Sequence, residues 1–274
     1  MLPRSLPVAL AILAVVACAV GGCVAPGAAR PPTPTLVSPD ELPPPTATPR
    51  PPPQAMPSAD LISVTGQGVP PNVLDEIAVA LRQGAPHVCI ALDVACDFPV
   101  TVEVFADQAA FDREVMNPDM RGYFALSGDG LIQMVSPANS GRDELAYHDG
   151  VAVALHEFVH LTLDRIDPEL PDWLEEGTAV YLAPHEVYDR ACREQLAGVD
   201  LPTLNELRDH YNDVPAPDLF AYTLVASIVT NNGLDGLNTL LRAPNDLERA
   251  LGRPAADVER TWREYTQSGC VPQT

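Results

Sequence analysis

The chain has 274 residues and a formal net charge of −21 at pH 7, and all 16 of its lysine-plus-arginine positions are arginine. A chain this acidic is not expected to bind nucleic acid or an anionic lipid surface, because like charges repel there. Residues 58 to 274 suffice for one domain with a sizeable core, and their composition gives no indication of an oligomeric state.

The first 23 residues have the organisation of a secretory signal. Arg4 supplies a positive charge, and an apolar run follows from Leu6 to Val20. The sequence Val20-Gly21-Gly22-Cys23 resembles a bacterial lipobox, which implies that Cys23 becomes the lipidated first residue of the mature protein. An alternative match at Cys18 leaves a shorter apolar core, and an uncleaved anchor would place the domain on the same side. We therefore expect a lipid-anchored, extracytoplasmic protein of the bacterial cell envelope.

Residues 24 to 57 form a proline-rich segment, with 13 prolines among 34 residues and almost no large apolar side chains. This composition cannot bury a core and favours extended polyproline conformations. The segment is predicted to be a disordered, semi-rigid linker that holds the following domain, residues 58 to 274, away from the membrane.

Four cysteines follow the signal region: Cys89, Cys96, Cys192 and Cys270. An even number in a compartment that permits disulfides predicts structural bridges, and none of the four belongs to a C-x-x-C metal motif. Three pairings are possible. A local bridge between Cys89 and Cys96 could close the short apolar segment between them, which would leave Cys192 to join Cys270.

Hydrophobic spacing predicts several elements before the central motif. Val73 to Leu81 has helical spacing, alternation from Pro99 to Phe105 predicts a strand, and Ala109 to Val115 is predicted to be helical. Gly122 to Val135 is expected to form a hairpin that turns at Ser127-Gly128-Asp129-Gly130. Ser140 with Asp143 offers a weak capping box before the next helix.

That next helix contains His156-Glu157-Phe158-Val159-His160 within an apolar run from Val151 to Leu163. Residues four apart lie on one face of a helix, so both imidazoles can bind one ion while Glu157 stands beside it. This is the H-E-x-x-H pattern of zinc-dependent hydrolases, in which the ion keeps an open position for water and a carboxylate accepts the proton. Alone, the pattern also suits a buried helix with two core histidines. Because the run is apolar around its circumference, the helix is expected to be central and buried.

A second helix is predicted from Pro171 to Tyr181, after the breaks at Asp167-Pro168 and Leu170-Pro171. The two helices can fold back on each other and bring Glu176 to the histidines. Here the chain resembles the gluzincin metallopeptidases, whose second block is W-L-x-E-G-x-A. The matching residues are Trp173, Leu174, Glu176, Gly177 and Ala179. The resemblance is closest to the small peptidase MA-like domains and extends from roughly residue 99 to the C-terminus.

The resemblance implies that His156, His160 and Glu176 ligate Zn2+ and that Glu157 is the general base. The chain departs from it at one position. Many gluzincins carry an acidic residue four positions after the ligand glutamate, where it orients a ligand histidine, but this chain has Val180. Either another group such as Asp149 or Asp164 substitutes, or zinc is held less tightly. Glu175 is expected to contribute little, because it lies about 100° from Glu176 around the helix.

Five short helical stretches are predicted after the site and resemble the C-terminal half of peptidase MA-like domains. They cover Thr203–His210, Asp218–Asn231, Leu234–Arg242, Asp246–Leu251 and Ala255–Thr266. Tyr222 looks like the tyrosine whose hydroxyl stabilises the transition state in related gluzincins. The alternative is a core tyrosine whose hydroxyl reaches the surface. The expected fold class is α+β, a small sheet packed on the central H-E-x-x-H helix and followed by a mostly helical half.

These features predict a membrane-tethered zinc metallopeptidase that acts on peptide or protein substrates. The stretch from Gly130 to Ser136 lacks the glutamate of the G-x-M-E-N block of related aminopeptidases, so a general aminopeptidase is not expected. The alternative is an inactive member of the fold that serves as a binding or adhesion module at the cell surface, which would not require Glu157. A closed structural zinc site would need a fourth ligand such as His148 or His185, each of which is expected to face solvent or to be hydrogen-bonded instead.

Overall fold

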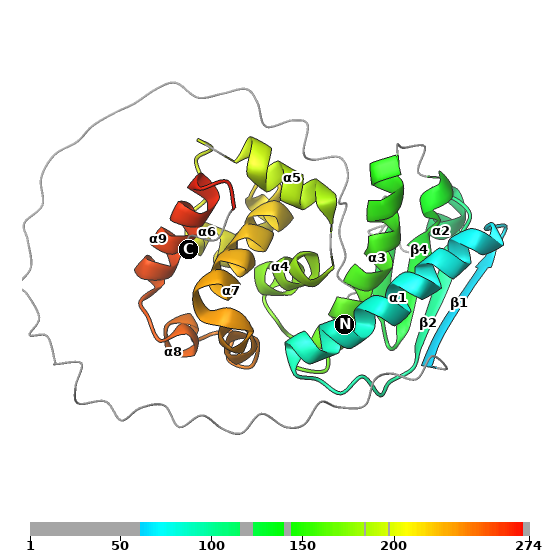
Figure 1. Cartoon of the computed structure of the whole chain (residues 1–274), viewed down its shortest axis with the longest axis horizontal. Coiled ribbons are helices and arrows are strands. Elements are labelled where there is room, and N and C mark those ends of the chain that lie inside the picture. The colour runs from blue at the N-terminus through cyan, green and yellow to red at the C-terminus, as the bar shows by residue number, and fades with distance from the viewer. Residues whose placement is uncertain (1–60, 116–122, 140–143, 184, 197, 271–274) are drawn as a thin grey trace, which may run out of the picture.

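The computed structural model describes residues 61–115, 123–139, 144–183, 185–196 and 198–270. The first half contains β1 (Ile62–Gln67), α1 (Pro71–Leu92), β2 (Val100–Phe105), α2 (Gln108–Val115), β3 (Ala125–Gly128), β4 (Leu131–Val135) and α3 (Glu144–Leu163). The second half contains α4 (Asp172–Leu182), α5 (Glu186–Gln195), α6 (Leu204–Asp209), α7 (Pro217–Leu241), α8 (Leu247–Leu251) and α9 (Ala255–Gln267). Figure 1 shows the strands gathered at one end of the molecule and the later helices at the other. The predicted α+β class is confirmed. The signal, the linker and the capping box at Ser140 and Asp143 lie outside the described residues.

The four strands of the described residues form one sheet in the order β1-β2-β4-β3. β1, β2 and β4 run parallel, and β3 pairs antiparallel with β4. The predicted hairpin is confirmed: Asp129 and Gly130 join β3 to β4 with φ values of 51° and 77°. Positive φ at both residues of a two-residue turn matches the twist of the flanking strands, which explains the Asp-Gly pair. β1 was not predicted from the sequence.

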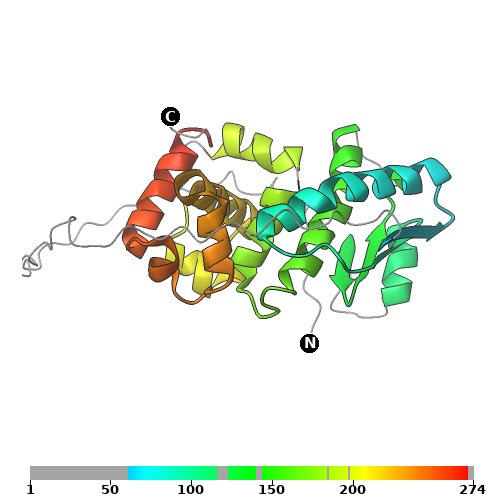
Figure 2. The same ribbon diagram turned by 60° about the horizontal axis from the view of Figure 1, so that its bottom comes forward.

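The two faces of the sheet are covered by different helices. Side chains alternate along a strand, so Val102 and Val104 of β2 face the main core while Phe105 packs with Phe111 of α2 in a smaller cluster. α1 and α3 pack on the main-core face, and Figure 2 shows α2 on the side of the sheet opposite α1. By the same alternation, Ser127 of β3 points to the face that α3 covers.

The H-E-x-x-H helix, α3, lies at the centre of the fold, between α1, the sheet and α4. Every residue from Ala154 to Leu163 is buried, whereas residues 148 to 153 are exposed or half-buried. The predicted burial therefore holds for the half of α3 that carries both histidines. Phe98 stacks on Phe158 of this half, with ring centroids 5.6 Å apart.

α4 is buried from Trp173 to Val180 and packs against α7. Gly177 permits this approach, because a Cβ at that position would come within 2.6 Å of the Ala221 carbonyl oxygen of α7. The glycine beside Glu176 therefore fixes how closely α4 sits on α7 and, through α4, where the Glu176 carboxylate lies.

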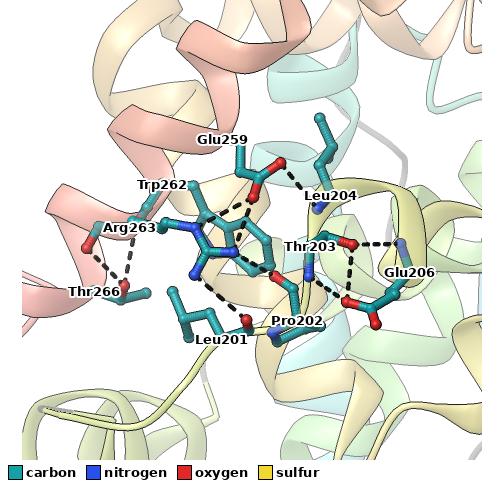
Figure 3. Close-up of polar contacts among 9 residues, drawn as sticks. All are labelled: Leu201, Pro202, Thr203, Leu204, Glu206, Glu259, Trp262, Arg263 and Thr266. Atoms are coloured by element: carbon teal, nitrogen blue, oxygen red, sulfur yellow. Dashed lines mark hydrogen bonds and ion pairs between the residues drawn. The ribbon is translucent and has the colours of Figure 1, made fainter. Parts of the chain in front are cut away.

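The helical half is joined by polar contacts between α9 and the segment before α6 (Figure 3). The Arg263 guanidinium of α9 donates to the carbonyl oxygens of Leu201 and Pro202 and to the carboxylate of Glu259. Thr203 and Glu206 form a reciprocal capping box that begins α6.

The helices predicted after the site are present. The stretches at Asp218–Asn231 and Leu234–Arg242 are two helices within the range labelled α7, and a kink at Gly233 (φ 69°) separates them. α5 was not predicted. Its sequence is mostly polar, and only Tyr188, Ala191 and Cys192 are buried.

Both expected disulfides are present. Cys89 of α1 is bonded to Cys96, and Cys192 of α5 is bonded to Cys270 after α9. The Cα atoms are 5.7 Å apart in the first bridge and 6.0 Å in the second. Two disulfides indicate an oxidising, extracytoplasmic environment. None of the helices in the described parts of the chain is both long enough and apolar enough to cross a membrane.

Candidate metal centre

The two histidines of α3 converge as their spacing predicts. The Nε2 atoms of His156 and His160 lie 3.0 Å apart, and both side chains are buried. Since the two residues are one helical turn apart on one face, both rings extend from α3 toward α4.

Glu176 of α4 completes the group. Its Oε2 atom is buried, lies 3.4 Å from the Nε2 of His156 and of His160, and accepts no hydrogen bond from a described residue. Ligand atoms about 2.0 to 2.2 Å from a tetrahedral ion are separated by about 3.3 to 3.6 Å, so the three atoms are close to the spacing that a metal requires. His156, His160 and Glu176 therefore form a group that could hold a metal ion, as predicted.

The ionisable side chains of the group shift the pKa values of one another. Burial alone would lower the pKa of His160, but the carboxylates of Glu176 and Glu175 outweigh burial and hold this pKa well above its usual value. Burial would raise the pKa of Glu176, and the two histidines reverse that effect and lower it. Both shifts follow from the closeness of the glutamate carboxylates to the two imidazoles.

A carboxylate that orients His160 comes from Glu175. Its Oε1 atom accepts a hydrogen bond from Nδ1 of His160 at 2.9 Å, in a buried contact. This contact contradicts the helical-angle argument that placed Glu175 away from the site. The His160 ring contacts Glu175 through Nδ1 and Glu176 through Nε2. These two glutamates both contact the ring although they lie about 100° apart around α4. Val180 belongs to the core, and Asp149 instead accepts from the backbone N–H of Glu186 at 3.0 Å.

We expect Glu175→Gln to lower metal affinity by about 10- to 100-fold, because a carboxylate behind a ligand histidine fixes its tautomer and raises its basicity. Competition with a chelator measures the change. Glu194→Gln, at an exposed position of α5, is the matched control and should leave affinity unaltered. Equal affinities for the two variants would contradict the role given to Glu175.

Glu157 lies beside the group and has a hydrogen-bond partner on the sheet. Ser127 of β3 donates from its hydroxyl to Oε2 of Glu157 at 2.7 Å. Burial raises the pKa of Glu157, while His160, His156 and the Ser127 hydrogen bond act to lower it. The sequence placed Ser127 only in a hairpin turn, so this contact between distant elements was not predicted.

The hydroxyl of Tyr222 contacts a different carboxylate. It donates to Asp189 of α5, and the pKa of Tyr222 is raised by burial and by this contact. The hydroxyl therefore has a partner outside the His156, His160 and Glu176 group. Its role in the transition state stays a prediction from the resemblance, tested by the rate of Tyr222→Phe.

Two further polar side chains near the group were not predicted to belong to it. Asp218, in the first turn of α7, is buried and accepts from the Tyr211 hydroxyl at 2.5 Å; burial and Glu176 raise its pKa. His185, at the start of α5, is buried with its ring centroid 5.5 Å from that of His156. The expectation that His185 faces solvent or is hydrogen-bonded was wrong, since neither ring nitrogen has a partner among the described residues.

Comparison with known proteins gave no matching family model and no matching curated sequence.

Proposed function

We propose that the chain is a zinc metallopeptidase of the gluzincin type. The observation that carries the proposal is the buried His156, His160 and Glu176 group with Glu157 beside it on the same helix. Two histidines and one carboxylate are the ligand set of catalytic zinc in several peptidases, and they leave room for water and substrate. A site that only stabilises the fold would need a fourth protein ligand. Among the described residues the group has three members.

The chain's own residues supply the acid–base chemistry of the proposed reaction. Zinc, when bound, polarises water and a carbonyl group. Glu157 accepts the proton of the attacking water and passes it to the nitrogen of the leaving amine as the C–N bond breaks. Burial suits Glu157 to this exchange, because a carboxylate with a raised pKa holds a proton more readily between the two steps. Ser127 fixes one oxygen of Glu157 and leaves the other for the proton.

The position of the sheet favours a peptide as substrate. β3 is the last strand of the described sheet, and its Ser127 contacts the proposed base. An extended peptide can add to such an edge through main-chain hydrogen bonds, which would bring its backbone beside Glu157. No glutamate for a free amino terminus is present from Gly130 to Ser136, so we propose cleavage within peptides rather than general aminopeptidase activity.

We place this activity on the outer side of a bacterial membrane. The proposed anchor is the lipid on Cys23, and the proline-rich segment from 24 to 57 would separate the domain from the bilayer. The two disulfides support an oxidising compartment. The acidic composition agrees with attachment through the lipid rather than through contact with anionic headgroups.

The full chain is expected to retain about one zinc ion after dialysis, because three buried ligands converge at the site. His160→Ala removes one ligand and should reduce the content to near zero. His87→Ala changes an exposed histidine of α1 and should leave zinc content as in the wild type. Elemental analysis measures the zinc content of the wild type and of both variants. A wild-type protein that stays metal-free after incubation with zinc would refute the metal site and the proposed function.

Digestion of a peptide library, with and without a chelator, tests whether the metal serves hydrolysis. We expect cleavage that a chelator abolishes and added zinc restores. Zinc binding without any cleavage would favour the alternative function, an inactive binding or adhesion module at the cell surface.

A further inference from the structure

His185 is a buried histidine without a hydrogen-bond partner, and it lies against the metal centre. It is 4% exposed, and its Nδ1 and Nε2 atoms are both buried and unpaired among the described residues. A buried polar atom without a partner costs roughly 1 to 3 kcal/mol, and native structures contain few of them. Two such atoms on one ring therefore require an explanation.

The position of the His185 ring offers an explanation for its unpaired nitrogens. It packs edge-to-face against His156, with centroids 5.5 Å apart, and against Tyr188 of the adjoining helix α5 at 5.9 Å. These contacts hold the ring beside the group formed by His156, His160 and Glu176, although no nitrogen of His185 belongs to that group. Nδ1 of His156 is a third buried atom without a partner among the described residues. Both rings of this contact thus carry unpaired nitrogen atoms among the described residues.

We propose that His185 is a further catalytic residue, whose ring N–H donates a hydrogen bond to the carbonyl oxygen of a peptide bound at the metal centre. This inference rests on the proposed function. A neutral imidazole has one N–H donor and one acceptor nitrogen, so one ring can bind both the C=O and the N–H of a peptide backbone. A donor held in a dry pocket stabilises the negative charge that develops on the carbonyl oxygen more than it stabilises the uncharged substrate.

The His185 ring is better suited than the Tyr222 hydroxyl to donate a hydrogen bond to the substrate carbonyl oxygen. The Tyr222 hydroxyl is held by the Asp189 carboxylate, and it would have to leave a charged acceptor to reach a substrate. The nitrogens of His185 lose no partner among the described residues when a ligand arrives. A neutral imidazole at this position keeps one donor and one acceptor nitrogen for a bound peptide.

The test uses the full chain loaded with Zn2+ or Co2+ and an N-phosphoryl-leucyl dipeptide, whose tetrahedral oxyanion resembles the charge formed during hydrolysis. His185→Phe keeps a ring of similar size and removes both nitrogens. We expect its affinity for the probe to fall by about 10- to 100-fold, as for a lost hydrogen bond to a charged group. Zinc content and the visible spectrum of the Co2+ form without probe should stay as in the wild type. His185→Gln restores a donor and should recover part of the affinity.

His87→Phe, at an exposed histidine of α1, is the matched control and should bind the probe as the wild type does. Should the His185→Phe variant fail to fold in thermal melting, His185→Met replaces it and carries the same expectation.

The outcomes separate the two proposals. A wild-type chain that takes up no metal defeats the proposed function. A chain that takes up metal, but whose nitrogen-free His185 variants bind the probe as tightly as the wild type, overturns only the role of His185. Loss of metal or an altered Co2+ spectrum in those variants would make His185 a metal ligand and would overturn the inference as well.

Discussion

Glu157→Gln is expected to slow peptide hydrolysis by about 100-fold or more while leaving zinc content and folding intact. Glutamine has nearly the same shape as glutamate and keeps an oxygen that can accept the Ser127 hydroxyl, so the side chain should stay in place. What it lacks is the ability to accept and return a proton. The loss should therefore appear in kcat, measured by steady-state kinetics on any peptide that the wild type cleaves.

The matched control for this experiment is Glu169→Gln, which removes the same charge at an exposed position between α3 and α4. It should hydrolyse peptide at the wild-type rate. Thermal melting and elemental analysis accompany both variants. If the Glu157→Gln and Glu169→Gln variants turned over substrate equally fast, Glu157 would not be the base, and the rate would have to depend on another group.

The elements that the sequence predicted are those whose pattern is local and strong. The apolar run of α3 and the alternation of β2 specify a period without reference to other parts of the chain. β1 has no such pattern, because only Ile62 is buried and the strand lies at the sheet edge. α1 continues to Leu92 although Gly84 and Pro86 lie within it, since packing on α3 and the sheet outweighs weak helix propensity.

The residues of the candidate site also divide into those with a local sequence pattern and those without one. The convergence of His156 and His160 follows from spacing within one helix, and Glu176 follows from a second motif. Which carboxylate meets Nδ1 of His160 depends instead on how α4 crosses α3, and that crossing is set by the packing of α4 on α7 at Gly177. Helical angles alone do not decide whether Glu175 or Glu176 contacts Nδ1 of His160, because the imidazole ring presents a nitrogen on each side.

Contacts between elements distant in the sequence explain the remaining misses. Ser127 lies 30 residues before Glu157, and its hydroxyl reaches the Glu157 carboxylate only because β3 is placed beside α3. His185 precedes a helix with little apolar character, so neither its burial nor its position against His156 had a local signal. Ser127 and His185 can be assigned to the site only once the packing of the elements around α3 is known.

Removing the Cys192–Cys270 bridge is expected to cost more stability than removing the Cys89–Cys96 bridge. The first joins residues 78 apart in sequence and the second joins residues 7 apart. In the chain-entropy account a bridge stabilises by restricting the unfolded chain, by about 4.5 kcal/mol for the long loop and about 2.5 kcal/mol for the short one. We therefore expect the free energy of unfolding to fall by about 2 kcal/mol more when the long bridge is lost.

The experiment compares two double variants, Cys192→Ala with Cys270→Ala and Cys89→Ala with Cys96→Ala, in denaturant unfolding at about 25 °C, the temperature to which the loop-closure figures apply. Alanine avoids burying a new hydroxyl group, which matters because Cys192 and Cys89 are both buried. The long bridge also ties α5 to the end of the chain beyond α9, and α5 carries Tyr188, the packing partner of His185. Loss of this bridge should therefore loosen His185 as well. If the short bridge proved to contribute as much stability as the long one, native packing around each cysteine, rather than loop closure, would govern both.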